Sequence, residues 1–153
     1  LGLRTTIHAE NTPILKWREA RLKAAGRHDF PAHLEMHADI AAVEATCRAA
    51  LFAEWTGAKI HIAHESCRHS LPWIAHAKAR GVDITAETCP HYLLLSMADE
   101  SRLPGTFLRV KPPLRGPEHA EHIWRALLDG TVDMISTEHA PHLPAEKARG
   151  SVW

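Results

Sequence analysis

Hydrophobic residues along this chain follow two patterns that alternate from one end to the other. Short apolar runs rich in β-branched residues predict strands at residues 5–9, 59–64, 82–87 and 131–137. Apolar residues at three- to four-residue spacing, together with cap signals, predict helices at residues 12–25, 37–55, 71–80 and 117–128. Strands that alternate with helices indicate a parallel sheet with helical crossovers, so we predict an α/β fold.

The connections carry two further signals. We expect Ser70 to cap the helix at 71–80, because serine side chains accept hydrogen bonds from the first turn of a helix. Residues 88–117 contain several prolines, so we predict a long loop there. A loop of this length is usually functional, and it follows a strand on the side where ligands bind in α/β folds.

Three of the predicted strands carry a metal-binding side chain at or near their ends, namely His8, His64 and Glu138. The carboxyl ends of parallel strands meet at one edge of a sheet, so we expect these side chains to converge. Imidazole and carboxylate groups are ligands for zinc. Taken singly, His8 or His64 could also be a core residue whose imidazole is hydrogen-bonded to the backbone.

Composition limits the size and the partners of the chain. Its 153 residues, 45% of them hydrophobic, suffice for a single domain over 1–153, whereas a complete eight-unit barrel typically needs about 250 residues. Lysine and arginine (18) balance aspartate and glutamate (18), so no net charge attracts nucleic acid or an anionic membrane. We therefore expect neither as a partner.

The cysteines and the first residues bear on the compartment. The 3 cysteines lie far apart without a CxxC pair, which favours a reducing cytoplasm over a disulfide framework or a thiolate zinc site. The first residues lack a secretory signal, and no stretch approaches the length of a membrane span. The chain begins without methionine, so we expect either the downstream part of a longer protein or a processed terminus.

Five short motifs occur in one order, each at a predicted strand end or just after one: HAEN (8–11), HIAHES (61–66), AETCPHYL (86–93), KPPLR (111–115) and TEHAPH (137–142). Together they closely resemble the cyclic amidohydrolases, which comprise dihydroorotase, allantoinase, and dihydropyrimidinase or hydantoinase. The resemblance covers nearly the whole chain.

The resemblance implies a (β/α)8 TIM barrel with two zinc ions at its mouth, bridged by a hydroxide and usually by a carboxylated lysine. This chain resembles strands 5 to 8 with their helices, the second half of that barrel. By the resemblance, His8 and His64 are the strand-five and strand-six histidines that hold one zinc. Glu138 is the strand-eight carboxylate, which binds the other zinc and carries the proton.

The implied reaction is hydrolysis of a C–N bond in a small cyclic amide, of the dihydroorotate, allantoin, hydantoin or dihydropyrimidine class, by a zinc-activated hydroxide. The family resemblance also implies that Lys111 and His142 face the substrate and that Arg115 braces the loop around it. These roles come from the resemblance and not from spacing.

The sequence departs from the family pattern in several places. Relatives usually have aspartate at position 138, a smaller polar residue at 111 and an aliphatic residue at 65. The HxH pair of strand one and the lysine of strand four have no counterpart, so this chain supplies at most three ligands and would hold one zinc ion or none. A non-catalytic homologue or fragment with a structural or assembly role is therefore the alternative, and a mononuclear amidohydrolase also stays open.

Some expectations concern packing. Half a barrel leaves its first and last strands with unpaired edges, so we expect a homo-oligomer. His61 is expected to be packed or hydrogen-bonded, and Cys89 to be packed and not nucleophilic. We expect the remaining aromatic residues to pack in the core or between layers, namely Tyr92, Trp17, Trp55, Trp73 and Trp124.

Overall fold

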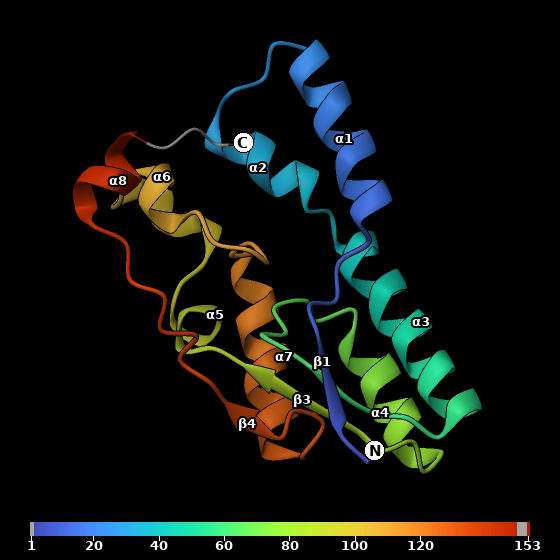
Figure 1. The fold of residues 1–153 in the computed structure, drawn as a ribbon. Helices are drawn as coiled ribbons and strands as arrows, with labels where there is room; N and C mark the ends of the chain where they lie inside the picture. The colour runs from blue at the N-terminus through green and yellow to red at the C-terminus, as the bar shows by residue number, and fades with distance from the viewer. Residues whose placement is uncertain (1, 150–152) are drawn as a thin grey trace.

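The fold is built on a sheet of four parallel strands. The computed structural model describes residues 2–149 and 153 of the chain. The strands lie side by side in sequence order and are β1 (Arg4–Ile7), β2 (Lys59–Ile62), β3 (Ile84–Thr88) and β4 (Met134–Ile135). All three neighbouring pairs are parallel. The predicted α/β fold with a parallel sheet is confirmed (Figure 1).

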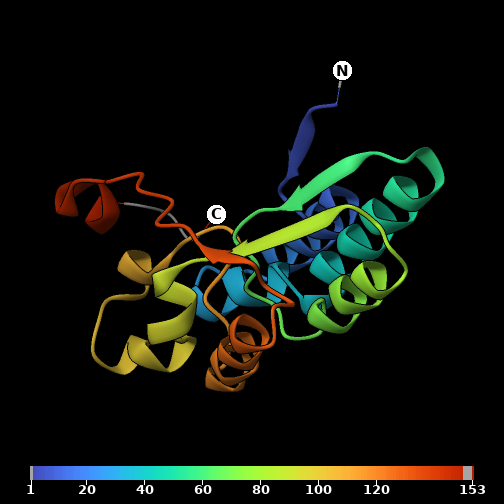
Figure 2. The same cartoon turned by 90° about the horizontal axis from the view of Figure 1, so that it is seen from below.

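Helices connect the strands. The longer helices are α1 (Thr12–Ala24), α2 (Phe30–Met36), α3 (Asp39–Thr56), α4 (Leu71–Ala79) and α7 (Pro117–Leu128). Short helices are α5 (Pro90–Leu94), the 3-10 helix η1 (Met97–Ser101), α6 (Gly105–Leu108) and α8 (Pro144–Arg149). Figure 2 shows α3, α4 and α7 on one face of the sheet. No described helix is long and apolar enough to cross a membrane.

Two buried clusters hold these layers together. The first lies where α3 and α4 cover the sheet, and its small residues Ala50 and Ala53 let α3 approach Ile60 closely. The second gathers the apolar side chains around α5 and α7, including Tyr92 and Ile123. Because dense packing excludes water from both clusters, they fix the sheet relative to its helices.

Local signals explain where the first helices begin and end. The side chain of Asn11 accepts a hydrogen bond from the backbone N–H of Ile14 at 3.1 Å and caps α1. Gly57 closes α3 in the left-handed conformation, with φ of 69°. Ser70 precedes α4, but its side chain makes no capping hydrogen bond, so the predicted cap is wrong. The backbone of Ser70 is itself helical, which turns the side chain away from the first turn.

The chain contains more helix than its sequence predicted. The predicted loop 88–117 holds α5, η1 and α6, and α2 was also missed. These elements are too short to show helical periodicity, although Ser96 and Asp99 form a capping box at η1. β4 is shorter than the predicted strand 131–137, because its regular pairing covers only two residues.

Aromatic residues pack less than expected. Tyr92 is buried, and its hydroxyl donates to the backbone oxygen of Pro112 at 2.7 Å. The four tryptophans at 17, 55, 73 and 124 are instead 44% to 83% exposed, so the prediction of core packing is wrong for them. They lie on outward-facing parts of helices, where spacing alone does not distinguish a buried from an exposed aromatic residue.

Candidate metal and substrate site

Two histidines meet beyond the ends of neighbouring strands. His8 directly follows β1, and His64 lies two residues beyond β2. The parallel register aligns Ile7 with Ile62, which brings both chain exits to the same edge. Nδ1 of His8 lies 3.1 Å from Nε2 of His64. Two nitrogens bound to one tetrahedral zinc ion at 2.0–2.1 Å lie about 3.3 Å apart, so this pair fits that metal.

A buried carboxylate holds His8 from the other side. The side chain of Glu10 is 1% exposed and accepts from Nε2 of His8 at 3.0 Å and from Nδ1 of His37 at 2.7 Å. Burial opposes ionisation of Glu10, but the hydrogen bonds from His37 and His8 outweigh it and lower its pKa to about 2. Glu10 is therefore ionised at neutral pH.

The protonation of His64 suits a metal ligand. Burial, reinforced by the neighbouring His8, lowers the pKa of His64 from its ordinary value, against a smaller opposing effect of Glu138. The imidazole is thus neutral near pH 7, as a metal-binding histidine must be.

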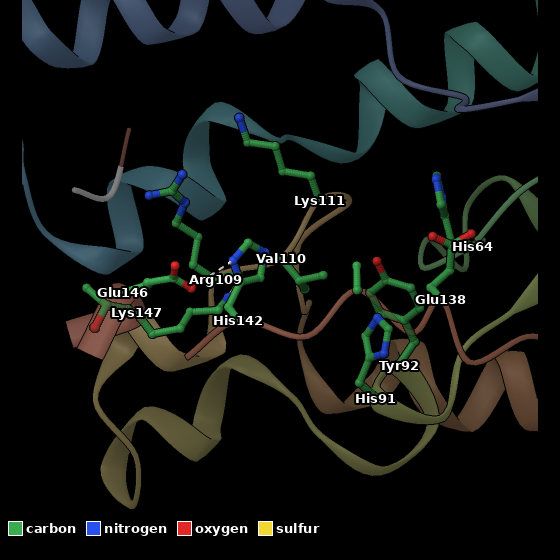
Figure 3. Close-up of a pocket in the computed structure, with 12 residues that line it drawn as sticks. His64, His91, Tyr92, Arg109, Val110, Lys111, Glu138, His142, Glu146 and Lys147 are labelled. Carbon is green, nitrogen blue, oxygen red and sulfur yellow. Dashed lines mark hydrogen bonds and ion pairs between the residues drawn. The ribbon is translucent and has the colours of Figure 1, made fainter. Parts of the chain in front are cut away.

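His64 opens onto a cavity of about 530 Å³. Glu138, Lys111 and His142 also line it, so the structure places four of the five predicted site residues around one space. Figure 3 shows Glu138 beside His64, whereas the ammonium group of Lys111 is directed away from both. His142 is mostly exposed, and its Nδ1 lies 3.8 Å from Oε2 of Glu146.

The backbone is strained at two of the predicted ligands. His64 and Glu138 have positive φ angles of 41° and 48°, in the left-handed region that favours glycine. Residues held in this conformation occur preferentially at functional sites, where the surrounding structure maintains the strain. The backbone thus turns sharply at His64 in HIAHES and at Glu138 in TEHAPH.

Glu10 and His37, which support the site, were not predicted from the sequence. Glu10 lies in the motif HAEN, two residues after His8. A carboxylate at this spacing could have been predicted to accept a hydrogen bond from the imidazole of His8. The polar residues around His37 predict a solvated surface histidine, which is wrong, because His37 is 1% exposed. Its contact with Glu10 gave no local signal, because the two residues lie 27 positions apart. His91 lines the cavity with a buried Nε2 that has no hydrogen-bond partner among the described residues.

His61 is hydrogen-bonded within the sheet, and Cys89 is packed in the core. His61 places Nδ1 2.8 Å from Oγ1 of Thr85 and Nε2 3.2 Å from Oε2 of Glu87, in agreement with the prediction that it is hydrogen-bonded. Cys89 is fully buried, and burial raises the pKa of its thiol to about 12. A thiol with this pKa is not a nucleophile at neutral pH.

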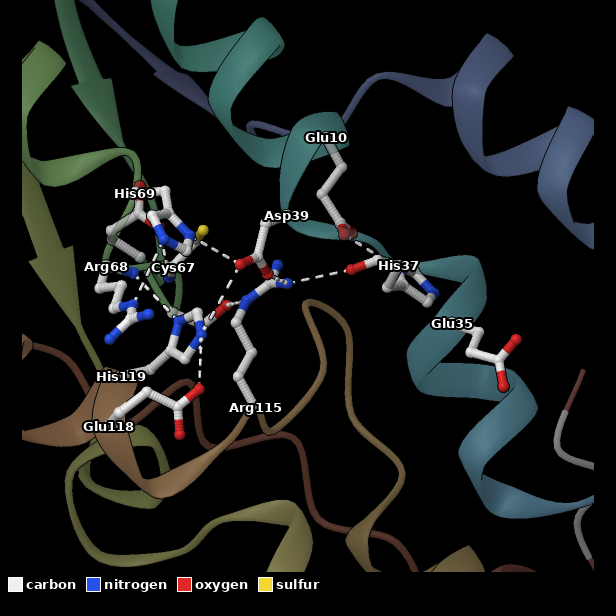
Figure 4. Close-up of polar contacts among 12 residues, drawn as sticks. Glu10, Glu35, His37, Asp39, Cys67, Arg68, His69, Arg115, Glu118 and His119 are labelled. Carbon is white, nitrogen blue, oxygen red and sulfur yellow. Dashed lines mark hydrogen bonds and ion pairs between the residues drawn. The ribbon is translucent and has the colours of Figure 1, made fainter.

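Arg115 ties the neighbouring loops together, as expected. Its Nε donates to Oγ of Ser66 at 3.1 Å, and its Nη1 donates to the backbone oxygen of His37 at 3.0 Å and to Oδ1 of Asp39 at 2.6 Å (Figure 4). Asp39 also lies close to Cys67 and His69, with possible ligand atoms within 4.8 Å of one another.

This second cluster is a hydrogen-bonded network and not a convincing metal site. The buried guanidinium of Arg115 already neutralises Asp39. Nδ1 of His69 lies 2.7 Å from the other oxygen of Asp39, so both carboxylate oxygens already have a partner. A cation bound to Asp39 would compete with both contacts.

The chain is similar to curated enzymes over nearly its whole length. An allantoinase from Rubrobacter xylanophilus is 38% identical over 148 residues, which is 97% of this chain and 32% of the relative. A dihydroorotase from Syntrophobacter fumaroxidans is 50% identical over 95 residues, 62% of this chain and 21% of the relative. No protein-family model matches the chain.

Solved structures give the same result. A D-hydantoinase from Bacillus sp. AR9 superposes with a TM-score of 0.92 at 30% identity, covering 99% of this chain and 34% of that protein. A dihydropyrimidinase from Brevibacillus agri NCHU1002 has a TM-score of 0.90 at 29% identity and covers 95% and 32%.

The parallel sheet and the strand-end histidines therefore define an α/β chain of the hydantoinase type. This chain belongs to the cyclic amidohydrolase family. It spans about a third of the length of the allantoinase and the D-hydantoinase that it matches.

Proposed function

We propose that this chain provides part of the active site of a metal-dependent hydrolase that opens a small cyclic amide. The observation that carries the proposal is the pair of imidazoles, with Nδ1 of His8 3.1 Å from Nε2 of His64, beside a cavity that Glu138 also lines. The names of the relatives, allantoinase, dihydroorotase and hydantoinase, support cyclic amides as the substrate class.

His8 and His64 would hold zinc through the two facing nitrogens, and Glu138 would complete the ligands from this chain. Zinc, when bound there, supplies a nucleophile at neutral pH by lowering the pKa of water. The family resemblance implies two zinc ions, of which His8 and His64 would hold one and Glu138 would bind the other.

Glu138 would move the proton. A carboxylate beside the attacking water can accept its proton and deliver it to the ring nitrogen as the C–N bond breaks and the C–O bond forms. Glutamate extends one methylene farther than the aspartate usual in relatives, and a misplaced group can cost roughly a hundredfold in rate.

Substrate would occupy the cavity of about 530 Å³, a volume within the range of small-molecule sites. Lys111 and His142 would contact it, although the ammonium group of Lys111 would first have to swing toward the cavity. The substrate would be a ring of the dihydroorotate, allantoin, hydantoin or dihydropyrimidine class.

The position of the chain in its fold is also part of the proposal. Four parallel strands in sequence order are the arrangement found along the wall of a (β/α)8 barrel. We propose that they correspond to strands 5 to 8, that residues 1–153 form one domain, and that the protein acts in the cytoplasm.

A ring-opening assay tests the proposal. The protein, purified without chelator and supplied with zinc, should bind zinc and open at least one of the four ring types, and His64→Ala should lose both properties. Glu138→Asp should raise turnover by up to about a hundredfold, because it restores the shorter carboxylate. If no ring opens at any zinc concentration and His64→Ala takes up zinc as the parent does, the chain is a non-catalytic homologue.

A further inference from the structure

The buried side chain of Glu10 lies between the half-exposed imidazole of His8 and the buried imidazole of His37. One carboxylate oxygen is 3.0 Å from Nε2 of His8, and the other is 2.7 Å from Nδ1 of His37. His8 in turn directs Nδ1 toward Nε2 of His64. A continuous row of polar contacts thus runs from His37 through Glu10 to the histidine pair.

The chemistry of a carboxylate fixes the protons along this row. An ionised carboxylate only accepts hydrogen bonds, so both nitrogens that face Glu10 must carry hydrogen. For neutral His8 the proton is therefore on Nε2, and Nδ1 has a free lone pair that faces His64. For neutral His37 the proton is on Nδ1. Without Glu10, nothing among the described contacts of His8 would favour this tautomer over the other.

We propose that Glu10, oriented by His37, is the positioning residue that holds His8 in the tautomer with Nδ1 free to bind a metal. This inference deepens the proposed function and rests on it. Carboxylates that orient metal-binding histidines in this way typically contribute 10- to 100-fold to metal affinity or activity.

His37 is itself fixed in place, which gives Glu10 a firm partner. Arg115 donates to the backbone oxygen of His37 at 3.0 Å and to Oγ of Ser66 at 3.1 Å. Ser66 lies two residues after His64, so Arg115 joins the segment that orients His8 to the segment that carries His64. On the other side, the backbone N–H of Asn11 donates to the oxygen of Ala41 at 2.9 Å and anchors HAEN to α3.

Nitrogen NMR of the metal-free chain tests the tautomer directly, because the two ring nitrogens of histidine have different shifts when protonated and when free. We expect His8 of the parent chain to be protonated at Nε2. In Glu10→Gln the amide offers one acceptor and one donor, so at least one of the two imidazoles must change its tautomer. Zinc affinity should fall about 10- to 100-fold in Glu10→Gln.

Matched variants separate positioning from general damage. Glu54→Gln makes the same change at an exposed residue and should leave the tautomer of His8 and the zinc affinity unchanged. His37→Asn keeps a donor near the position of Nδ1 and should retain most of the zinc affinity, whereas His37→Leu should lose it to about the extent of Glu10→Gln. If Glu10 and His37 only stabilised the fold, variants with similar thermal stability would not show this order of zinc affinities.

The inference is overturned if His8 of the parent chain is protonated at Nδ1. It is also overturned if Glu10→Gln leaves both tautomers unchanged, or if its zinc affinity stays within about twofold of the parent. If the parent chain takes up no zinc, the proposed metal site fails, while the spectra still show whether Glu10 sets the tautomer of His8.

Discussion

At the scale of single residues, the sequence revealed the types of the site residues but not their surroundings. His8, His64 and Glu138 could be selected because each follows an apolar run of strand type. The left-handed backbone at His64 and Glu138 could not, since glycine is favoured there and other residues, even the enriched Asn, Asp and His, adopt it uncommonly. The contact of Glu10 with His37 depends on tertiary packing, which no local pattern encodes.

The strain at His64 can be measured by comparing two variants. His64→Gly and His64→Ala both remove the imidazole, but only glycine adopts φ of 41° without steric cost. Relief of the strain exceeds the entropy that glycine gains on unfolding, so we expect His64→Gly to be about 0.5–1 kcal/mol more stable than His64→Ala. Chemical denaturation measures the difference, and equal stabilities would show that the backbone is not strained.

Glu65 should make stability depend on pH. Burial raises its pKa from 4.5 to about 7, and the nearby backbone N–H groups and Arg115 oppose this only in part. In this window the folded chain keeps a proton that the unfolded chain has lost, so the free energy of unfolding falls as pH rises from about 4.5 to 7.

Glu65→Gln should therefore be more stable than the parent at pH values above this window, by on the order of 3 kcal/mol. Its side-chain oxygen can still accept from the backbone N–H of Cys67, which lies 2.7 Å from Oε1 in the parent. Denaturation series across the pH range provide the measurement. Glu54→Gln is the matched control at an exposed position, and a Glu65→Gln profile that parallels the parent would refute the expectation.

At the scale of elements, periodicity was sufficient for the long helices and insufficient for the short ones. α1, α3, α4 and α7 lie close to their predicted ranges because each spans at least two turns. α2, α5 and α6 are held by tertiary contacts and short turns, so their sequences resemble loops. β4 shows that a β-branched run marks the place of a strand without fixing its length.

The caps of α1 and α4 should differ in energetic importance. Asn11→Ala removes the hydrogen bond to the N–H of Ile14 and should cost about 1 kcal/mol of stability. Ser70→Ala removes a side chain that makes no capping hydrogen bond to α4 and should cost much less. Thermal denaturation of the two variants checks the difference, and equal losses would contradict it.

At the scale of the whole molecule, alternation of strands and helices was enough to predict the parallel sheet. The sequence could not show how far its two edge strands are exposed. β1 and β4 end the sheet, and Leu3, Met134 and Ile135 are exposed near them. Unpaired strand edges with exposed apolar residues favour association.

We therefore expect the chain to form a homo-oligomer, which sedimentation at several concentrations would detect. Ile135→Lys places a charge on the edge strand β4 and should shift the equilibrium toward monomer. Ile40→Lys is a control at an exposed apolar position on α3. A compact monomer at all concentrations, or equal effects of both lysines, would contradict an association through this edge.

The contacts of Arg115 couple the motion of residues 109–116 to the histidine pair. Its side chain reaches His37 and Asp39, more than seventy positions earlier in the chain, as well as Ser66. The segment 109–116 therefore cannot swing outward without loosening the supports of both imidazoles. Binding of a metal ion by the two imidazoles should therefore slow amide hydrogen exchange in residues 109–116. By thermodynamic reciprocity, a compound that immobilises this segment should raise the affinity of the imidazoles for the ion.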